Sequence, residues 1–158
     1  SVTAHDGVVY ALGGRQNTAI AVRAGGKGDV TKSHVLWRKN IGSNVSSPVY
    51  YDGHLYWASE SKSLAYCVNA KTGEQVYEEK LSDERMRIYA SPLIADGRIY
   101  YVSRLKGAFV VPAKAAFEVL AHNVISSDES VFNASPVPLG PGQLLLRSDR
   151  FLYCIGKK

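Results

Sequence analysis

The sequence predicts an all-β protein built from a repeated unit of four antiparallel strands. Three observations predict this fold: a short pattern recurs at a near-constant spacing, Asp-Gly pairs occur where two strands would turn back on each other, and strand-forming residues are frequent whereas no long stretch has helical spacing. With 158 residues, 46% of them hydrophobic, the chain is long enough to bury a core.

The repeat is clearest in a segment that runs from Ser-Pro to Asp-Gly. Residues 47–53 (SPVYYDG) return as residues 91–97 (SPLIADG), 44 positions later, and residues 1–7 (SVTAHDG) match them 46 positions earlier. A fourth copy begins another 44 positions on, at Ser135-Pro136, and its turn reads Gly140-Pro141-Gly142. Four copies at one period indicate a repeat architecture.

Each repeat holds its expected strands in the same order. The Ser-Pro segment forms the first strand, the Asp-Gly pair makes a two-residue turn, and an apolar run forms the second strand. A third apolar run follows a polar loop, and a fourth follows a turn such as residues 71–74 (KTGE). The expected second strands are 8–10, 55–57, 99–101 and 144–146; the third strands are 19–22, 65–68, 108–111 and 152–155; the fourth strands are 35–37, 75–77 and 118–120.

Four antiparallel strands in about 44 residues is the size of one β-propeller blade, and such blades pack face to face around an axis. We expect complete blades at 1–46, 47–90 and 91–134 and an incomplete blade at 135–158, about three and a half in all. The first strand of each blade is expected to be innermost, where a Pro at a strand start costs little. The last repeat ends after its third strand. We therefore expect a parent protein with about seven or eight blades, whose other blades complete the ring. A second copy of the chain is the less favoured way to close it.

Two segments resemble the pyrroloquinoline-quinone-like (PQQ-like) repeat family. Residues 91–102 (SPLIADGRIYYV) and residues 64–77 (LAYCVNAKTGEQVY) are similar to its pattern, in which a third strand and turn reading like YALDAKTG precede an outer-strand Trp. The family includes bacterial quinoprotein dehydrogenases and the outer-membrane assembly lipoprotein BamB, and the resemblance covers nearly the whole chain. It implies a propeller fold and, by analogy, an extracytoplasmic location in a bacterial periplasm or envelope, although this chain holds no signal-peptide pattern.

The chain departs from the family pattern at several positions. The outer-strand Trp is kept at Trp37, but the second blade has Tyr77 and the third has Ala121. For the enzymatic members, the resemblance implies a disulfide of adjacent cysteines below the quinone and a calcium site of acidic and amide side chains. Cys67 and Cys154 are far apart in the chain, and no acidic cluster occupies a fixed repeat position. We therefore expect no cofactor, with PQQ and calcium only if the chain belongs to a quinone-dependent dehydrogenase.

Three other features have structural explanations. Cys67 and Cys154 occupy the same third-strand position two blades apart, which is beyond the ~7 Å Cα separation of a disulfide, so two buried thiols are expected. Residues 25–29 (GGKGD) indicate a loop leading into an outer strand, because a phosphate-binding loop requires a helix after it. The histidines lack ligand-like spacing, and no Ser, His and acid set is brought together. His5 and His54 flank Asp-Gly turns, and His34 and His122 lie near outer strands.

The predicted binding site lies in the loops at the mouth of the channel. Propellers bind partners there, with the loops that enter the inner strand and the loops between the second and third strands. The excess of Arg and Lys in these loops points to an anionic or carbonyl-rich partner, since Arg binds carboxylates through two parallel hydrogen bonds, although an ordinary solvated rim would look the same. The first set of loops holds Asn44, Arg85, Arg87, Tyr89 and Asn133, and the second set holds Glu60, Lys62, Arg104, Lys106, Arg147 and Arg150.

The charge and hydropathy patterns indicate neither nucleic-acid binding nor a transmembrane segment. The net charge is +5, but the Lys and Arg residues are scattered and do not alternate with aromatics as on a nucleic-acid surface, and no apolar stretch reaches the length of a membrane span. The sequence favours a non-catalytic scaffold that binds protein or polysaccharide at its rim, in envelope assembly. The alternatives are a quinone-dependent dehydrogenase whose active site lies in other blades, and a propeller hydrolase of glycans or polyesters, which would need carboxylates facing the channel.

Overall fold

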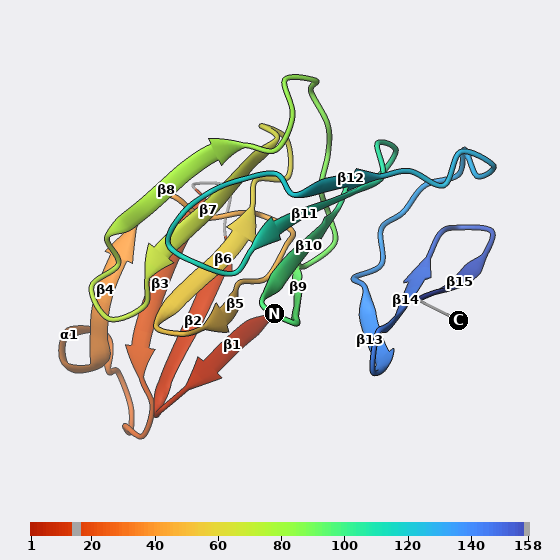
Figure 1. Ribbon diagram of the computed structural model, residues 1–158. Helices are drawn as coiled ribbons and strands as arrows, with labels where there is room; N and C mark the ends of the chain where they lie inside the picture. Colours follow the sequence, from red (N-terminus) through yellow and green to blue (C-terminus); the bar gives the residue numbers. More distant parts are fainter. Residues whose placement is uncertain (14–16, 157–158) are drawn as a thin grey trace.

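The computed structural model describes residues 1–13 and 17–156 and consists almost entirely of β-structure (Figure 1). Residues 14–16, within the first predicted blade, and Lys157 and Lys158, at the end of the last, lie outside the described residues. The strands form four antiparallel sheets, and each sheet follows the chain order of its strands. The all-β prediction is therefore confirmed, and each sheet lies inside one predicted blade, whose boundaries themselves stay predictions.

The strands have the following bounds. The first sheet contains β1 (Val2–His5), β2 (Val8–Gly13), β3 (Thr18–Arg23) and β4 (Val35–Lys39). The second contains β5 (Val49–Tyr51), β6 (His54–Ala58), β7 (Leu64–Asn69) and β8 (Gln75–Lys80). The third contains β9 (Leu93–Ala95), β10 (Arg98–Val102), β11 (Ala108–Pro112) and β12 (Ala121–Asn123). The fourth contains β13 (Val137–Gly140), β14 (Gln143–Arg147) and β15 (Leu152–Gly156).

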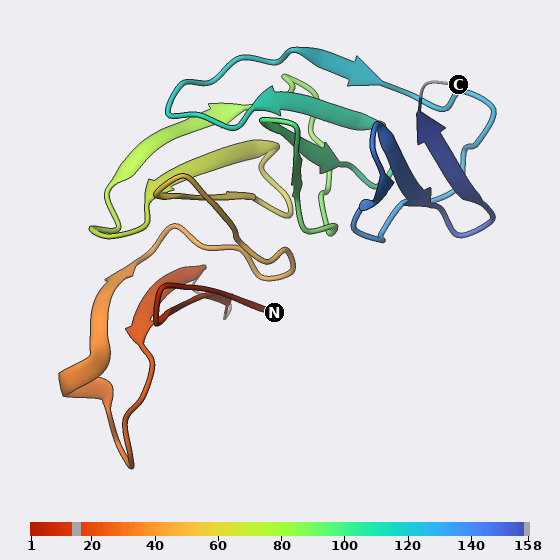
Figure 2. The same ribbon diagram turned by 60° about the horizontal axis from the view of Figure 1, so that its bottom comes forward.

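The four sheets follow one another along an arc, as blades do around a propeller axis (Figure 2). The contacts between sheets include β1 with β5 and β5 with β9, so the first strands of the first three blades lie next to one another. That the first strand of every blade is innermost stays a prediction. Hydrogen bonds also step between successive blades: Thr3 Oγ1 donates to the carbonyl oxygen of Pro48 over 2.6 Å, and the amide of Ser47 donates to Ser91 Oγ over 2.9 Å.

The predicted Asp-Gly hairpins are confirmed by the backbone geometry. Asp6, Asp52 and Asp96 have φ angles of 45°, 45° and 49°, and the glycine after each is also at positive φ. Positive φ at both central residues defines the type I′ turn, whose twist suits two antiparallel strands. In the fourth blade, Pro141-Gly142 connects Gly140 to its partner Gln143, with Gly142 at a φ of 69°, so a different turn closes the same hairpin.

Apolar cores fill the spaces between neighbouring blades, and Trp37 joins the first blade to the second. Trp37 Nε1 donates a buried 2.9 Å hydrogen bond to the carbonyl oxygen of Ala70. Its ring packs on Gly73, where an added Cβ would lie 2.7 Å from the ring. In the strand register, Trp37 is opposite Ala21. Tyr77 has the corresponding position in the second blade, opposite Cys67, and Ala121 has it in the third blade, opposite Val110.

The fourth strand of the third blade was wrongly placed by the sequence. The expected strand at 118–120 is observed three residues later, as β12. In the second blade, Gly73 adopts a φ of 70° and its amide bonds to the carbonyl of Asn69, which closes a tight turn. The third blade has Ala116 at the position of Gly73, 43 residues later, and Phe117 packs edge-on against Tyr77 at 5.5 Å. The connection between β11 and β12 is therefore longer than that between β7 and β8, and β12 begins to pair later along the chain.

Two further expectations are corrected. The segment after the glycine-rich loop, expected to be loop, contains the helical turn α1 (Thr31–His34) before β4 begins. Both cysteines are free, as expected, but only Cys67 is buried. Cys154 is exposed because it lies on β15, whose blade contributes little to the buried cores.

Candidate binding site

Two loops from neighbouring blades enclose a positively charged pocket. One loop connects β8 to β9 and contributes Arg85, Met86 and Arg87; the other connects β10 to β11 and contributes residues 104–106. The pocket has a volume of about 420 Å³, and four of its six lining residues are Arg or Lys. We call it the basic pocket.

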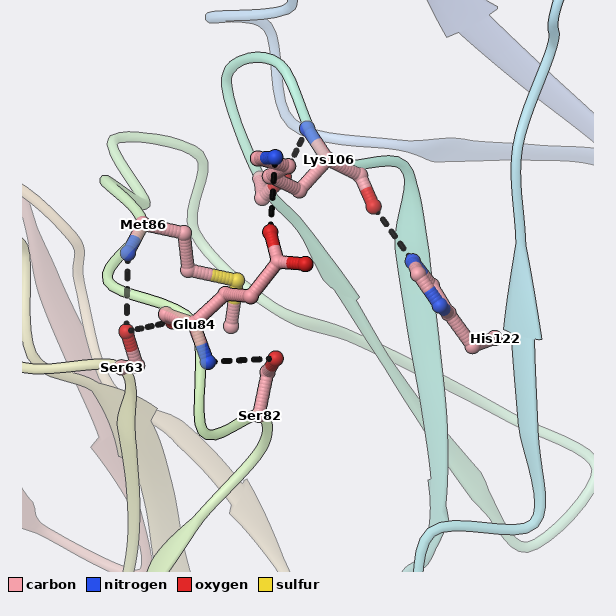
Figure 3. Close-up of polar contacts among 7 residues, drawn as sticks. Ser63, Ser82, Glu84, Met86, Lys106 and His122 are labelled. Atoms are coloured by element: carbon pink, nitrogen blue, oxygen red, sulfur yellow. Dashed lines mark hydrogen bonds and ion pairs between the residues drawn. The ribbon is translucent and has the colours of Figure 1, made fainter.

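The loop from β8 is held in place by Ser63. The hydroxyl of Ser63 donates to the carbonyl of Glu84 over 3.0 Å and accepts from the amide of Met86 over 2.9 Å (Figure 3). The Met86 and Ile88 side chains enter the core between the second and third blades. Because side chains alternate along this extended segment, Arg85 and Arg87 point away from the core and are exposed.

The loop from β10 is a tight turn closed by Ser103. Its hydroxyl accepts from the amide of Lys106 over 2.7 Å, and its amide donates to the carbonyl of Gly107 over 2.9 Å. Gly107 has a φ of 80°, and a Cβ there would collide with the carbonyl of Asn123. The amide of Arg104 donates to the carbonyl of Arg87 over 2.8 Å, which joins the two loops of the pocket.

The side chain of Arg104 is fixed by two neighbours. Its Nε donates to Asn133 Oδ1 over 2.9 Å, and its guanidinium carbon lies 4.6 Å from the centre of the Tyr89 ring. Arg87 reaches the hydroxyl of Tyr89 at 3.5 Å, the limit of a hydrogen bond. Tyr89 therefore lies between two guanidinium groups, which favours an ordered cation at the pocket wall.

Only one cation of the pocket has a carboxylate partner among residues 1–13 and 17–156. Lys106 Nζ lies 2.7 Å from Glu84 Oε2 (Figure 3), and this hydrogen bond lowers the pKa of Glu84. The guanidinium groups of Arg85, Arg87 and Arg104 have no such ion pair in that part of the chain. The arrangement is suited to an incoming carboxylate, because a guanidinium can bind both of its oxygens.

The structure brings together six of the eleven residues named in the predicted binding loops. Arg85, Arg87, Arg104 and Lys106 line the basic pocket, and Tyr89 and Asn133 contact Arg104. The two sets of loops therefore meet on one face of the propeller. That these residues bind a ligand stays a prediction.

The remaining predicted residues lie elsewhere on the rim. The amide of Asn44 donates to Glu60 Oε2 over 3.4 Å, at the junction of the first two blades. Lys62 is exposed in the loop between β6 and β7. Arg147 ends β14 and Arg150 precedes β15; both are exposed and lie outside the lining of the basic pocket.

Sequence reasoning missed the residues that support the pocket, namely Ser63, Ser103 and Glu84. A repeat signal was present for one of them. Ser59, Ser103 and Ser148 stand about 44 residues apart, and each hydroxyl accepts amide hydrogen bonds from the turn that follows. The Glu84–Lys106 pair has no counterpart in the repeat, so it could not be predicted from the spacing.

The described residues do not fit the quinone and calcium site that the family resemblance implies for its enzymes. Within residues 1–13 and 17–156, no group of three or more His, Cys, Asp or Glu side chains could hold a metal ion. Cys67 and Cys154 lie in different blades, so these residues do not supply the disulfide of adjacent cysteines. The absence of a cofactor stays a prediction. No helix in the described ranges is long and apolar enough to cross a membrane.

Comparisons with known proteins identify the fold. No family model matches the chain, and no curated protein matches it. Among solved structures, BamB from Moraxella catarrhalis is similar over 98% of this chain and 41% of its own, with 13% identity and a TM-score of 0.65. A quinohemoprotein alcohol dehydrogenase from Pseudomonas putida is similar over 72% of this chain and 18% of its own, with 16% identity and a TM-score of 0.56.

A third similar structure is the computationally designed protein Ika4. It matches 98% of this chain and 88% of its own, with 9% identity and a TM-score of 0.70. This chain spans less than half the length of BamB and of the quinohemoprotein alcohol dehydrogenase. Together with the four sheets arranged along an arc, these likenesses lead to one conclusion: the chain has the fold of a PQQ-like β-propeller and forms a run of its blades.

Proposed function

We propose that this chain is part of a non-catalytic propeller scaffold that binds an acidic segment of a partner protein at the basic pocket. The observation that carries the proposal is the convergence of Arg85, Arg87 and Arg104 on one pocket without carboxylate partners in the described residues. The Tyr89 ring and Asn133 fix Arg104 in advance, which reduces the entropy lost on binding. An acidic polysaccharide would satisfy the same charges and is the alternative partner.

The resemblance to the BamB-like and quinoprotein repeat family supports an extracytoplasmic site of action, in a bacterial periplasm or envelope. It also supports further blades that complete the ring. The pocket does not depend on further blades, because both of its loops belong to the blades described here.

The test uses a short peptide of Asp, Glu and Gly and a matched peptide in which Asn and Gln replace the acids. Binding is measured by fluorescence anisotropy at low and at physiological salt, with polygalacturonate as the polysaccharide probe. Of the two peptides, we expect only the acidic one to bind. Its affinity should fall as the salt concentration rises, because salt screens exposed charges. Tighter binding of polygalacturonate than of the peptide would favour the polysaccharide partner.

Site-directed variants assign the binding to the pocket. Arg87→Gln combined with Arg104→Gln is expected to weaken peptide binding about tenfold or more, since charged hydrogen bonds contribute about 1.5–3 kcal/mol each. Arg98→Gln, which removes an exposed Arg at the start of β10, is the control and should leave binding unchanged. Equal losses in both variants, or equal binding of the neutral peptide, would contradict the proposal.

A quinone-dependent dehydrogenase is the second candidate, favoured by the likeness to the quinohemoprotein alcohol dehydrogenase. In that case the residues of this chain would support an active site formed by other blades. The full-length protein would then show a quinone absorbance band and calcium-dependent dye reduction with an alcohol or sugar. Neither signal is expected for the scaffold.

A further inference from the structure

A second cavity lies between the third and fourth blades. Its volume is about 380 Å³, and apolar side chains such as Val102, Phe132 and Leu146 form most of its wall. Asp128 and Glu129 lie on its polar side. The volume falls in the range typical of small-molecule sites, about 300–1,000 Å³.

The repeat explains why this space is open. At the corresponding place between the second and third blades, Met86 and Tyr101 are buried, with 4% and 0% exposure, and belong to the core. Ser130 stands 44 positions after Met86, and Leu146 stands 45 positions after Tyr101. The strand registers agree, because Tyr101 is paired with Phe109 and Leu146 with Tyr153.

Both replacements are from a larger to a smaller side chain. Such replacements leave a cavity when the surrounding strands cannot move inward. Here hydrogen bonds hold the strands and loops at the repeat spacing: the amide of Phe132 bonds to the carbonyl of Arg104 over 2.9 Å, as the amide of Ile88 bonds to the carbonyl of Glu60 over 3.3 Å. The two smaller side chains therefore contribute to the cavity, which lies beside the three-stranded fourth sheet.

The polar side of the cavity is negative, in contrast to the basic pocket. Glu129 stands 44 positions after Arg85, so the repeat position has the opposite charge. Asp128 accepts from the hydroxyl of Ser130 over 2.6 Å and from the hydroxyl of Tyr153 over 2.8 Å. These bonds fix the carboxylate, and the residues that line the cavity include no Lys or Arg to neutralise it.

We propose that this cavity binds a small organic cation with an apolar body, of the class of aromatic and aliphatic amines. The apolar wall would hold the body of the ligand, and the Asp128 and Glu129 carboxylates would hold its ammonium group. This site adjoins the basic pocket, with Leu105 in the lining of both, but its polar residues are different and it does not depend on the scaffold function.

The experiment compares three probes of similar shape and different charge: phenethylamine, 2-phenylethanol and 3-phenylpropionate. Binding to the purified protein is followed by ligand-observed NMR titration. We expect phenethylamine to bind with a Kd on the order of 1 mM, as a ligand of this size can. Binding of the alcohol is expected to be about fivefold weaker, because a charge pair near 4 Å in water contributes about that factor. The carboxylate should bind more weakly still.

The decisive variant is Ser130→Met, which restores the side chain found at the repeat position. It is expected to fill the cavity and abolish phenethylamine binding, and a cooperative thermal unfolding transition shows that the variant is folded. Ser127→Met, in the same loop but outside the lining, is the control and should bind normally. Glu129→Gln should reduce the preference for the amine over the alcohol.

Three results would overturn the inference. They are phenethylamine binding that survives in a folded Ser130→Met variant, equal affinity for all three probes, and the absence of saturable binding of phenethylamine to the unmodified protein.

Discussion

The backbone amide of Ser47 donates a 2.9 Å hydrogen bond to the hydroxyl of Ser91, the residue that occupies the same position one blade later. The amide of Ser91 makes the same 2.9 Å bond to the hydroxyl of Ser135. Each bond spans 44 residues, which is the period of the repeat. The serines before Pro92 and Pro136 are thus explained by a bond between blades, a role that their position in the repeat does not reveal.

Replacing Ser91 with Ala is expected to lower the free energy of unfolding by about 1–2 kcal/mol, because the half-buried amide of Ser47 loses its acceptor. Urea unfolding followed by tryptophan fluorescence measures the change. Ser127→Ala, at an exposed loop position, serves as the matched control and should change stability by less than about 0.5 kcal/mol. Equal effects of the two substitutions would show that the bond between blades contributes nothing.

The contact between Trp37 and Gly73 can be separated from backbone strain by comparing two glycines. Gly73 has a φ of 70° and Gly28 a φ of 69°, but only the Cβ of an alanine at 73 would meet the Trp37 ring. Both alanine variants incur the cost of positive φ, about 1–2 kcal/mol. Gly73→Ala should therefore destabilise the protein more than Gly28→Ala, as measured by thermal unfolding. Matching shifts in the melting temperature would mean that the ring moves aside freely.

The two cysteines should differ in reactivity. Burial raises the pKa of the Cys67 thiol to about 11 and encloses its side chain, whereas Cys154 is exposed. Since the thiolate is the reactive form, a thiol reagent such as DTNB at pH 8 should modify one thiol quickly and the second only after unfolding. The Cys154→Ser variant should show no fast reaction. A fast phase in that variant would mean that Cys67 becomes accessible in the folded state.

The Asp128 carboxylate should make stability depend on acid pH. Hydrogen bonds from Ser130 and also from Ser148 and Tyr153 hold the pKa of Asp128 well below its usual value of about 3.9. Because the pKa of Asp128 is lower in the folded state than in the unfolded state, the carboxylate stabilises the fold at pH values above the unfolded-state pKa. This stabilisation is lost as the pH falls through about 4 and below. Asp128→Asn should thus be less stable than the unmodified protein at pH 7, with a gap that narrows toward pH 3. Asp149→Asn, at an exposed position, is the control, and a gap that does not depend on pH would refute the assignment.

Most of the strand arrangement could be predicted because it depends on local chemistry. Asp-Gly pairs such as Asp52-Gly53 favour type I′ turns wherever they occur, and the apolar runs on either side can pair in only one register that buries both. The third blade shows the limit of this reasoning. Ala116 stands where Gly73 closes a turn, and Phe117 finds a partner in Tyr77 of another blade, which displaces β12 along the chain.

The candidate site was predicted only in part, for a related reason. Charge and loop position were sufficient to select Arg85, Arg87, Arg104 and Lys106, but not to show that these four enclose one pocket. The pairing of Lys106 with Glu84, and the exposure of Cys154, depend on contacts between residues distant in the chain. The cavity beside Ser130 is visible in the sequence only after the structure shows that Met86 fills the equivalent space.

The sequential order of strands within each sheet also bears on how quickly the chain can fold. Every strand pairs with its neighbour in the sequence, so the loops that must close to form one blade are short. Slow folding in all-β proteins comes mainly from pairing between distant segments. In this chain the distant contacts are those between blades, such as the bond from Ser47 to Ser91, and these would form after the hairpins. Folding rates should therefore respond more to changes in the Asp-Gly turns, and unfolding rates more to changes at the serines that join the blades.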